Sequence, residues 1–164
     1  MQIRDATPRD FDTILALNEA EVTHTSAMDR ERIGHLNELA CYHRVAVEGE
    51  KLAGFLLAMD ESAPYKNDNH GWFAARYRSF VYVDRIVVAA EFAGRKVGSA
   101  LYADLFDFAQ ARQAAAVVCE YNLDPPNLPS EAFHRKWGFR QVGTQRVADD
   151  TKLVSMQAAE LAAS

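Results

Sequence analysis

The sequence predicts a mixed α/β fold in which helices flank a twisted, mostly antiparallel sheet. Residues 42–59 and 139–156 each read as two strands joined by a turn, the pattern of an antiparallel hairpin. Residues 80–88 and 115–120 are strand-like runs on either side of a helix-like run, and a crossover of this length implies one parallel pair. The 164 residues suffice for a sizeable core, so we expect one domain over residues 1–164.

The N-terminal half contains two predicted helices. A short strand over residues 2–6 precedes Thr7 and Pro8, where threonine suits a helix cap and proline suits the first helical position. Ser26 with Asp29 indicates the start of a second helix, which runs through Leu39.

The segment over residues 60–79 is polar and aromatic, and a loop of this length is uncommon unless it is functional or partly helical. We expect a short helix over residues 72–77. The following run, 80–88, is nearly all apolar and reads as a buried central strand interrupted by Asp84 and Arg85.

The C-terminal half alternates helix and strand. The helix after the central strand ends near Arg112, and residues 115–120 form the next strand. A short helix covers residues 127–137, and Gly138 ends it as a C-cap glycine. The final hairpin combines residues 139–147 with 151–156.

Composition narrows the possible partners. The net charge of −5 argues against a general nucleic-acid binder, so any phosphate site has to be built locally. The N-terminus lacks the apolar region of a signal peptide, and no stretch reaches the length of a membrane span, so we expect a cytoplasmic protein without membrane contact. Cys41 and Cys119 read as buried free thiols, and no cluster of side chains suggests a metal.

The loop over residues 92–101, Phe-Ala-Gly-Arg-Lys-Val-Gly-Ser-Ala-Leu, joins a strand to a helix start. The first N–H groups of a helix have no partner within it, and the helix dipole favours an anion there. The GxGxxG pattern of dinucleotide sites is absent, and Lys96 precedes Val97 and Gly98 instead of the Gly-Lys-Ser/Thr order of a P-loop. An ordinary strand-to-helix turn is the alternative reading.

A second segment, Asn127 to Phe139, lies one strand downstream. Together the two segments resemble the GNAT (Gcn5-related N-acetyltransferase) superfamily. Its first signature runs from a strand valine to an Arg/Gln-x-x-Gly-x-Gly/Ala loop, and Val88 through Gly98 fall in that register. Its second signature is matched in spacing by Asn127, Ser130, Phe133, His134, Gly138 and Phe139.

The sequence departs from the signatures at three positions. Ala93 replaces the loop Arg/Gln, although Arg95 lies nearby, Lys96 replaces the first glycine, and His134 replaces the helix tyrosine. The resemblance covers nearly the whole chain and implies a GNAT-type mixed sheet with splayed central parallel strands.

The resemblance implies acetyl-CoA as cosubstrate and no metal. The backbone of Ile86, Val87 and Val88 would pair with the pantetheine arm. The loop amides would hold the pyrophosphate, and Asn127 would bond the pantetheine or hold the loop. The expected cofactor-binding residues are Ile86, Val87, Val88, Ala93, Gly94, Arg95, Lys96, Val97, Gly98, Ser99, Asn127, Ser130, Phe133 and His134.

Amide formation needs a neutral amine, whereas an alkylamine is mostly protonated at pH 7. A base must therefore remove a proton, and Asp84 is the best candidate because it is an acid inside an apolar strand. The alternatives for Asp84 are an ion pair with Arg85 or another cation, or binding of the substrate ammonium. Glu120 is a second candidate carboxylate.

The leaving thiolate needs a proton donor. His134 occupies the position where the family has a tyrosine, and an imidazole can donate to sulfur. Packing against the cosubstrate is the alternative role of His134, and Tyr121 could replace it as donor.

The expected activity is acyl-CoA-dependent N-acetylation of a primary amine on a small molecule, by direct attack on the thioester. A catalytically silent acyl-CoA sensor and a protein N-terminal or lysine acetyltransferase are the alternatives, and the chain is expected as a monomer or homodimer. The candidate acceptor-site residues are Glu21, His24, Tyr65, Trp72, Asp84, Glu120 and Tyr121.

Overall fold

The computed structural model describes residues 1–21, 25–124 and 126–162. Seven strands form one mixed sheet in the order β1-β2-β3-β4-β5-β7-β6. The chain packs as two compact units, Met1–Met59 with Val83–Phe108, and Asp60–Tyr82 with Ala109–Ser164. The expectation of a mixed, mostly antiparallel sheet flanked by helices is confirmed.

The first unit is built on an antiparallel meander. Strands β1 (Gln2–Asp5) and β2 (Tyr42–Glu48) pair antiparallel, and β2 pairs antiparallel with β3 (Lys51–Asp60). The tight turn of this hairpin contains Gly49 at a φ of 63°, a left-handed angle that glycine adopts without a side-chain clash. The predicted strand at 2–6 and the hairpin at 42–59 are confirmed.

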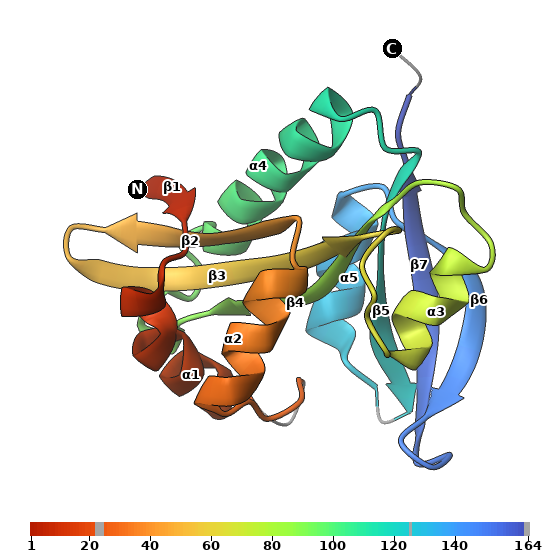
Figure 1. Cartoon of the computed structure of the whole chain (residues 1–164), viewed down its shortest axis with the longest axis horizontal. Helices are drawn as coiled ribbons and strands as arrows, with labels where there is room; N and C mark the ends of the chain where they lie inside the picture. Colours follow the sequence, from red (N-terminus) through yellow and green to blue (C-terminus); the bar gives the residue numbers. More distant parts are fainter. Residues whose placement is uncertain (22–24, 125, 163–164) are drawn as a thin grey trace. The chain divides into compact units, whose positions relative to one another are not determined.

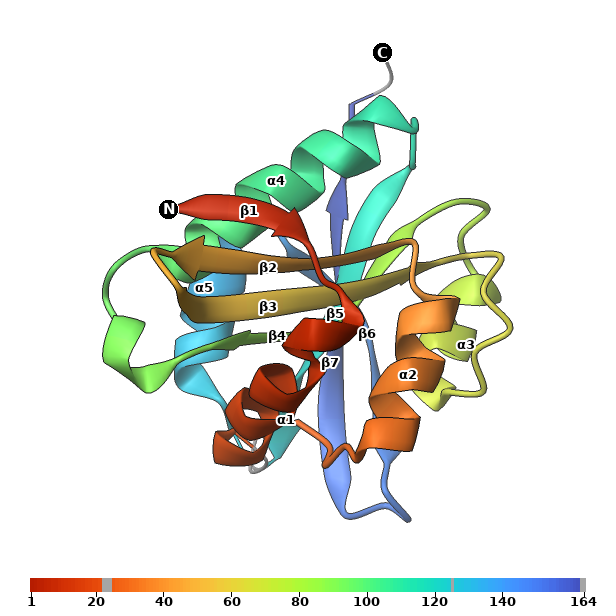
Figure 2. The same ribbon diagram turned by 60° about the vertical axis from the view of Figure 1, so that its left-hand side comes forward.

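Two helices cover one face of this meander. A 3-10 turn (Pro8–Asp10) leads into α1 (Phe11–Ala20), and α2 (Arg30–Leu39) follows. In Figures 1 and 2, α1 and α2 lie together on one side of β2 and β3. The shared core contains Phe11, Ile14, Ile33, Val45, Phe55 and Val87.

Helix α4 (Val97–Ala111) lies on the opposite side of β2 and β3 from α1 and α2 (Figure 2). Its approach to the strands depends on Gly54 in β3. A Cβ at this position would lie 2.7 Å from the carbonyl oxygen of Val87 and 3.1 Å from Cγ1 of Val97. The absence of a side chain at residue 54 therefore lets the end of β4 and the start of α4 come close to β3.

The second unit is built on β5 (Ala116–Asp124), β6 (Arg140–Val147) and β7 (Lys152–Glu160). β7 pairs antiparallel with both β5 and β6. The predicted parallel pair is present: β4 (Val81–Val88) has Val81 opposite Val117 and Tyr82 opposite Val118. The boundary between the two units falls inside β4, directly after these two paired residues.

Helices α3 (Asp68–Ala74) and α5 (Leu128–Lys136) belong to the second unit. Figures 1 and 2 show them on opposite sides of β7. Trp72 of α3 packs on Gly143 of β6, where a Cβ would lie 2.4 Å from the indole. On α5, the ring of His134 lies 5.1 Å from that of Phe139.

Four predicted boundaries need correction. The last strand, β7, runs to Glu160 and not to residue 156, because it continues to pair with β5 as far as Ala116. The second helix begins at Arg30 with Asp29 as its cap, so Ser26 lies outside it. The short helix of the 60–79 segment is Asp68–Ala74 and not 72–77, because Asn67 caps it by accepting from the N–H groups of Asn69 and His70. Strand β5 extends to Asp124, because β7 continues to pair with it.

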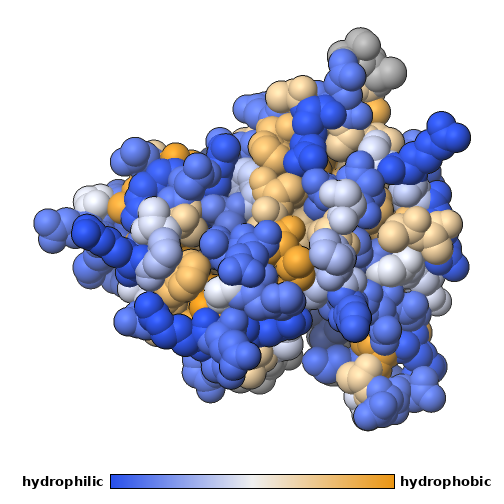
Figure 3. Space-filling model, viewed as in Figure 1, coloured by the Kyte–Doolittle hydropathy of each residue, from blue (hydrophilic) through white to orange (hydrophobic). Residues whose placement is uncertain are grey.

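The face shown in Figure 3 is mostly hydrophilic. Among the described residues, no helix combines the length and the apolar character needed to cross a bilayer. Cys41 and Cys119 are both free thiols, as expected. Cys119 is buried as predicted, whereas Cys41 is only half-buried, which corrects the expectation that both are buried.

Candidate functional site

The loop before α4 turns sharply at two residues. Gly94 has a φ of 78° and Lys96 a φ of 62°, so both adopt left-handed angles. A short 3-10 turn (Ala90–Phe92) precedes them, and the first backbone bond of the helix runs from Ala100 N–H to Lys96 O at 3.0 Å. The amides of Val97, Gly98 and Ser99 come before this bond. They are the helix-start donors that have no partner within a helix.

The charges of this loop are exposed. Lys96 is exposed, and the guanidinium of Arg95 lies 3.0 Å from Oε1 of Glu48 and 5.1 Å from the centroid of the Phe92 ring. An exposed ion pair of this kind contributes about 0–1 kcal/mol, so an anion can compete with Glu48 for Arg95. Ala93 sits in the same exposed turn.

The end of β4 alternates between the core and the other face. Val87 is buried in the core beneath α1 and α2, whereas Ile86 and Val88 are half-buried. Directly after the strand, the N–H of Ala89 bonds to the carbonyl oxygen of Ala53 at 2.8 Å. Close packing on β3 therefore fixes the position where the loop begins.

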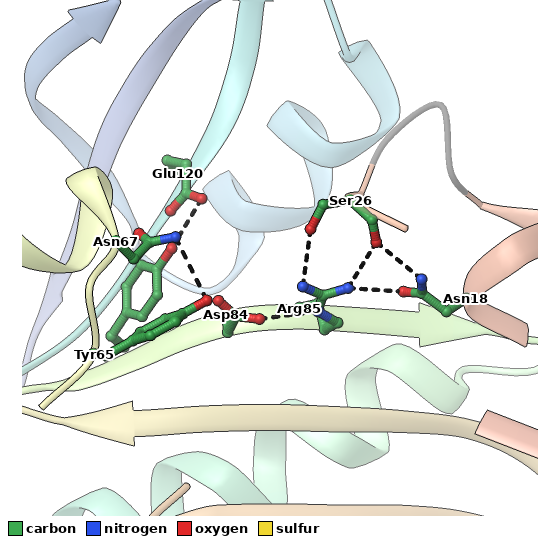
Figure 4. Close-up of polar contacts among 8 residues, drawn as sticks. Asn18, Ser26, Tyr65, Asn67, Asp84, Arg85 and Glu120 are labelled. Atoms are coloured by element: carbon green, nitrogen blue, oxygen red, sulfur yellow. Dashed lines mark hydrogen bonds and ion pairs between the residues drawn. The ribbon is translucent and has the colours of Figure 1, made fainter. Parts of the chain in front are cut away.

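Asp84 and Arg85 form a buried ion pair in β4. Nε of Arg85 lies 2.9 Å from Oδ2 of Asp84, and each side chain is only 4% exposed. Figure 4 shows that the guanidinium also points toward Asn18 and Ser26. The ion pair with Arg85 that the sequence left as an alternative for Asp84 is thus present.

In the second unit, α5 holds several predicted cosubstrate residues. Asn127 caps the helix, with its Oδ1 accepting from the N–H of Ser130 at 3.3 Å. His134 lies one turn after Ser130 and is buried, and Phe133 is half-buried beside it. The role of Asn127 in ordering its own helix is therefore visible in the structure.

The proton of His134 can be placed from its contacts. Nδ1 lies 2.6 Å from the carbonyl oxygen of Ser130, and a carbonyl can only accept, so Nδ1 carries the hydrogen. In the neutral ring Nε2 is then an acceptor. Burial lowers the pKa of His134, and the bond to Ser130 opposes this only in part. The neutral form therefore dominates at pH 7.

Tyr121 of β5 faces α5. Its ring centroid lies 5.9 Å from that of His134, and its hydroxyl accepts from Nε2 of Gln157 at 3.2 Å. Burial raises the pKa of Tyr121, so its hydroxyl keeps its proton at neutral pH. Nε2 of Gln157 also donates to Oγ of Ser155 at 2.6 Å. A pocket of about 430 Å³ opens beside this network, lined by Tyr121, Glu131, Arg135, Phe139, Arg140, Gln141 and Gln157.

The aromatic residues of the 60–79 segment pack within the second unit. Tyr65 is buried, and its ring lies 5.7 Å from that of His70. Trp72 packs on Gly143, with the guanidinium of Arg76 3.8 Å above its ring. Each of these side chains thus has a packing role in the unit.

Two further acceptor-site candidates belong to different units. Oε1 of Glu120, in the second unit, accepts from the hydroxyl of Tyr82 at 3.0 Å. Glu21, at the C-terminal end of α1 in the first unit, is half-buried. His24 lies outside the described residues.

The sequence interpretation missed Asn18 and gave Arg85 no role beyond that of a partner for Asp84. A signal for Asn18 was available, because it lies one helical turn after Ile14 and so shares the apolar face of α1. An amide on such a face needs a buried polar partner. Among the described residues, no group of acidic, histidine or cysteine side chains is arranged to hold a metal ion.

The sequence of this chain is similar to those of known acetyltransferases. The model of the acetyltransferase (GNAT) family matches residues 8–139. A phosphinothricin N-acetyltransferase from Streptomyces coelicolor is 34% identical over 103 residues, which are 63% of this chain and 54% of that protein. The match thus spans about half of the relative's length.

Solved structures show the same fold. A ribosomal-protein-alanine N-acetyltransferase from Brucella melitensis superimposes with a TM-score of 0.74 at 21% identity, over 98% of this chain and 100% of that one. A NatB acetyltransferase complex bound to CoA gives a TM-score of 0.75 at 13% identity, over 99% of this chain and 100% of that one. The matched residues make up most of the sequence, and the chain therefore belongs to the acetyltransferase (GNAT) family, whose members use acetyl-CoA.

Proposed function

We propose that this protein is an N-acetyltransferase that moves the acetyl group of acetyl-CoA to the primary amine of a small molecule. The observation that carries the proposal is the loop before α4, which turns at Gly94 and Lys96 and leaves the first amides of the helix free of helical partners. The family match over residues 8–139 supports the same activity.

The loop suits the pyrophosphate of the cosubstrate. Helix-start amides and the positive end of the helix dipole favour a phosphate group, and an exposed lysine and arginine lie beside them. We assign Ala93 through Ser99 to this contact. The backbone of Ile86 to Val88 is assigned to the pantetheine arm, as the family resemblance implies, and Asn127, Ser130 and Phe133 are assigned to the second contact region.

In the proposed reaction, the amine nitrogen attacks the thioester carbon, the carbon–sulfur bond breaks, and the products are the N-acetyl amide and the free thiol. The substrate ammonium must first lose a proton. We assign its removal to the carboxylate of Asp84, directly or through water.

The departing sulfur must gain a proton. At neutral pH the Nε2 atom of His134 accepts hydrogen bonds, so donation by this residue would require the minor imidazolium form. The hydroxyl of Tyr121 keeps its proton at neutral pH, because burial raises its pKa above the usual value of 10. We therefore assign the donor role to Tyr121 and give His134 the role of ordering α5 through its bond to Ser130.

The choice of a small-molecule acceptor rests on one comparison. The curated relative at 34% identity is named for an acceptor of low molecular weight, phosphinothricin. The protein acetyltransferases among the solved structures have lower identity and support the fold alone.

The test has two stages. Calorimetric titration with acetyl-CoA should show one binding site per chain, and an absence of binding heat would overturn the proposal. A thiol-release screen should then compare amino acids, polyamines and peptides with a free N-terminus. Turnover is expected with a small amine, whereas turnover confined to peptides would overturn the acceptor class, and binding without turnover would favour a sensor.

A further inference from the structure

Arg85 makes more contacts than an ion pair requires. Besides Asp84, its Nη1 donates to Oδ1 of Asn18 at 3.1 Å and to the carbonyl oxygen of Ser26 at 2.8 Å, and its Nη2 donates to Oγ of Ser26 at 3.0 Å. The side chain of Arg85 is 4% exposed. A planar guanidinium in this position can hold several acceptors in one rigid arrangement.

The three partners of Arg85 come from separate parts of the first unit. Asp84 is in β4, Asn18 is in α1, and Ser26 lies in the segment between α1 and α2. Asn18 is 1% exposed, and its Nδ2 donates to the carbonyl oxygen of Ser26 at 2.9 Å. That carbonyl oxygen thus accepts from both Asn18 and Arg85, which closes a ring of hydrogen bonds (Figure 4).

We propose that Arg85 is a positioning residue, which holds the carboxylate of Asp84 in its reactive place by anchoring it to Asn18 and Ser26. This proposal rests on the assignment of Asp84 as the base. A carboxylate on a strand can rotate about its side-chain bonds, and the guanidinium bond to Oδ2 restricts that rotation. Asn18 and Ser26 in turn keep the guanidinium from following the carboxylate.

The arrangement makes a lysine a poor substitute. An ammonium retains the charge, but it is a compact donor without the planar fork, so it cannot reach Asp84 and Ser26 together. For Arg85→Lys we expect a roughly 10-fold to 100-fold loss of kcat, the range that a small misplacement of a reacting group produces. The KM for acetyl-CoA should stay unchanged, because the α4 loop keeps its own contacts.

A double-mutant cycle separates positioning from general stability. The cycle compares kcat for the parent, Arg85→Lys, Asp84→Asn and the double variant. If Arg85 acts through Asp84, Arg85→Lys should lower kcat in the parent and have little effect in the Asp84→Asn background. Ser26→Ala, which removes one anchor and keeps the ion pair, should give a smaller loss that also disappears in that background.

Arg4→Lys is the matched control. Arg4 bonds both carboxylate oxygens of Asp10, at 2.8 and 2.9 Å, so the same change alters an arginine–carboxylate pair elsewhere in the first unit. This variant should retain the parent kcat. Urea unfolding of each variant shows whether it is folded, and Ser26→Ala carries the test if Arg85→Lys does not fold.

The outcomes distinguish the two proposals. If Asp84→Asn is as active as the parent, Asp84 is not the base, and the inference about Arg85 fails with it. If Asp84→Asn is impaired and Arg85→Lys lowers kcat by the same factor in both backgrounds, the base assignment stands and the inference about Arg85 is wrong.

Discussion

Lys96 stands where the resembled family motif has its first glycine, and it adopts a left-handed backbone angle. Its φ of 62° lies in the left-handed region of backbone angles. In that region the Cβ of a residue other than glycine is crowded by the following carbonyl oxygen, which costs about 1–2 kcal/mol. The side chain offers a cation beside the helix-start amides. The chain therefore accepts local strain at the position where it gains a charge.

Substitution at residue 96 can separate strain from charge. Lys96→Gly should raise the free energy of unfolding by about 1 kcal/mol, because glycine adopts the left-handed angle without a clash. Lys96→Ala removes the same charge and keeps the strain, so its stability should match that of the parent. Urea unfolding measures both, and equal stabilities of the two variants would contradict the strain argument.

His43 is a buried core histidine. It is 8% exposed, its Nδ1 lies 2.7 Å from Oδ1 of Asn37, and its ring packs between those of Phe11 and Phe55. Its Nε2 is buried without a hydrogen-bond partner among the described residues. A proton on this atom would carry charge into the core.

Because His43 is buried in its neutral form, we expect the free energy of unfolding to fall in mild acid. Burial lowers its pKa from 6.5 to about 4, so the unfolded chain takes up a proton that the folded chain resists. The stability from the neutral ring is fully present above pH 6.5 and disappears as the pH falls toward 4. The shift corresponds to about 3 kcal/mol.

Urea unfolding across this pH range should show the decline in the parent and a flatter profile in His43→Gln. The exposed His35 provides the control, since His35→Gln should leave the decline unchanged. The pKa of His134 is lowered in the same direction, so part of the decline should remain in His43→Gln. Identical profiles for the parent and His43→Gln would contradict the assignment.

At the scale of elements, Gly54 lets β3 pack closely against the end of β4 and the start of α4. Gly54→Ala should lower the free energy of unfolding by about 1–3 kcal/mol, because the new Cβ would meet the backbone oxygen of Val87 at 2.7 Å. Gly34→Ala in α2 has no atom within 4 Å of its Cβ and should instead gain about 0.5–1 kcal/mol. Chemical unfolding measures both, and a stabilised Gly54→Ala would refute the close-approach argument.

The elements most predictable from sequence were those with local signals. The hairpin over 42–59 and the helix ending at Gly138 followed from periodicity and turn residues, and both are present. The helix of the 60–79 segment was placed too late, because Asn67 and Asp68 read as loop residues although Asn67 caps the helix. Strand β5 was predicted too short, because its last residues are ordered by β7, some 30 residues later.

In the candidate site, too, features that are contiguous in the chain were predictable from sequence, whereas contacts between distant residues were not. The α4 loop and the α5 start were predictable because each motif is contiguous in the chain. The contacts of Arg85 were not, because Asn18 and Ser26 lie 67 and 59 residues away from it in sequence. The contact of Tyr121 was not predictable either, because its hydroxyl accepts a hydrogen bond from Gln157 on another strand.

At the scale of the whole molecule, two elements belong to both compact units. β4 contributes Val81 and Tyr82 to the second unit and the rest of the strand to the first, and α4 passes from the first unit to the second after Phe108. Unfolding of either unit would disrupt part of β4 and part of α4. The chain should therefore unfold as one cooperative domain, as its length of 164 residues also suggests.

The positions of the tryptophans make this testable. Trp72 and Trp137, the two tryptophans of the chain, both belong to the second unit, so their fluorescence reports on that unit alone. Far-ultraviolet circular dichroism reports on the helices and strands of both units. The two signals should give the same midpoint and the same slope in urea, because the shared strand and helix couple the units. Two separated transitions, with fluorescence following only one, would show that the units unfold independently and would contradict a single domain.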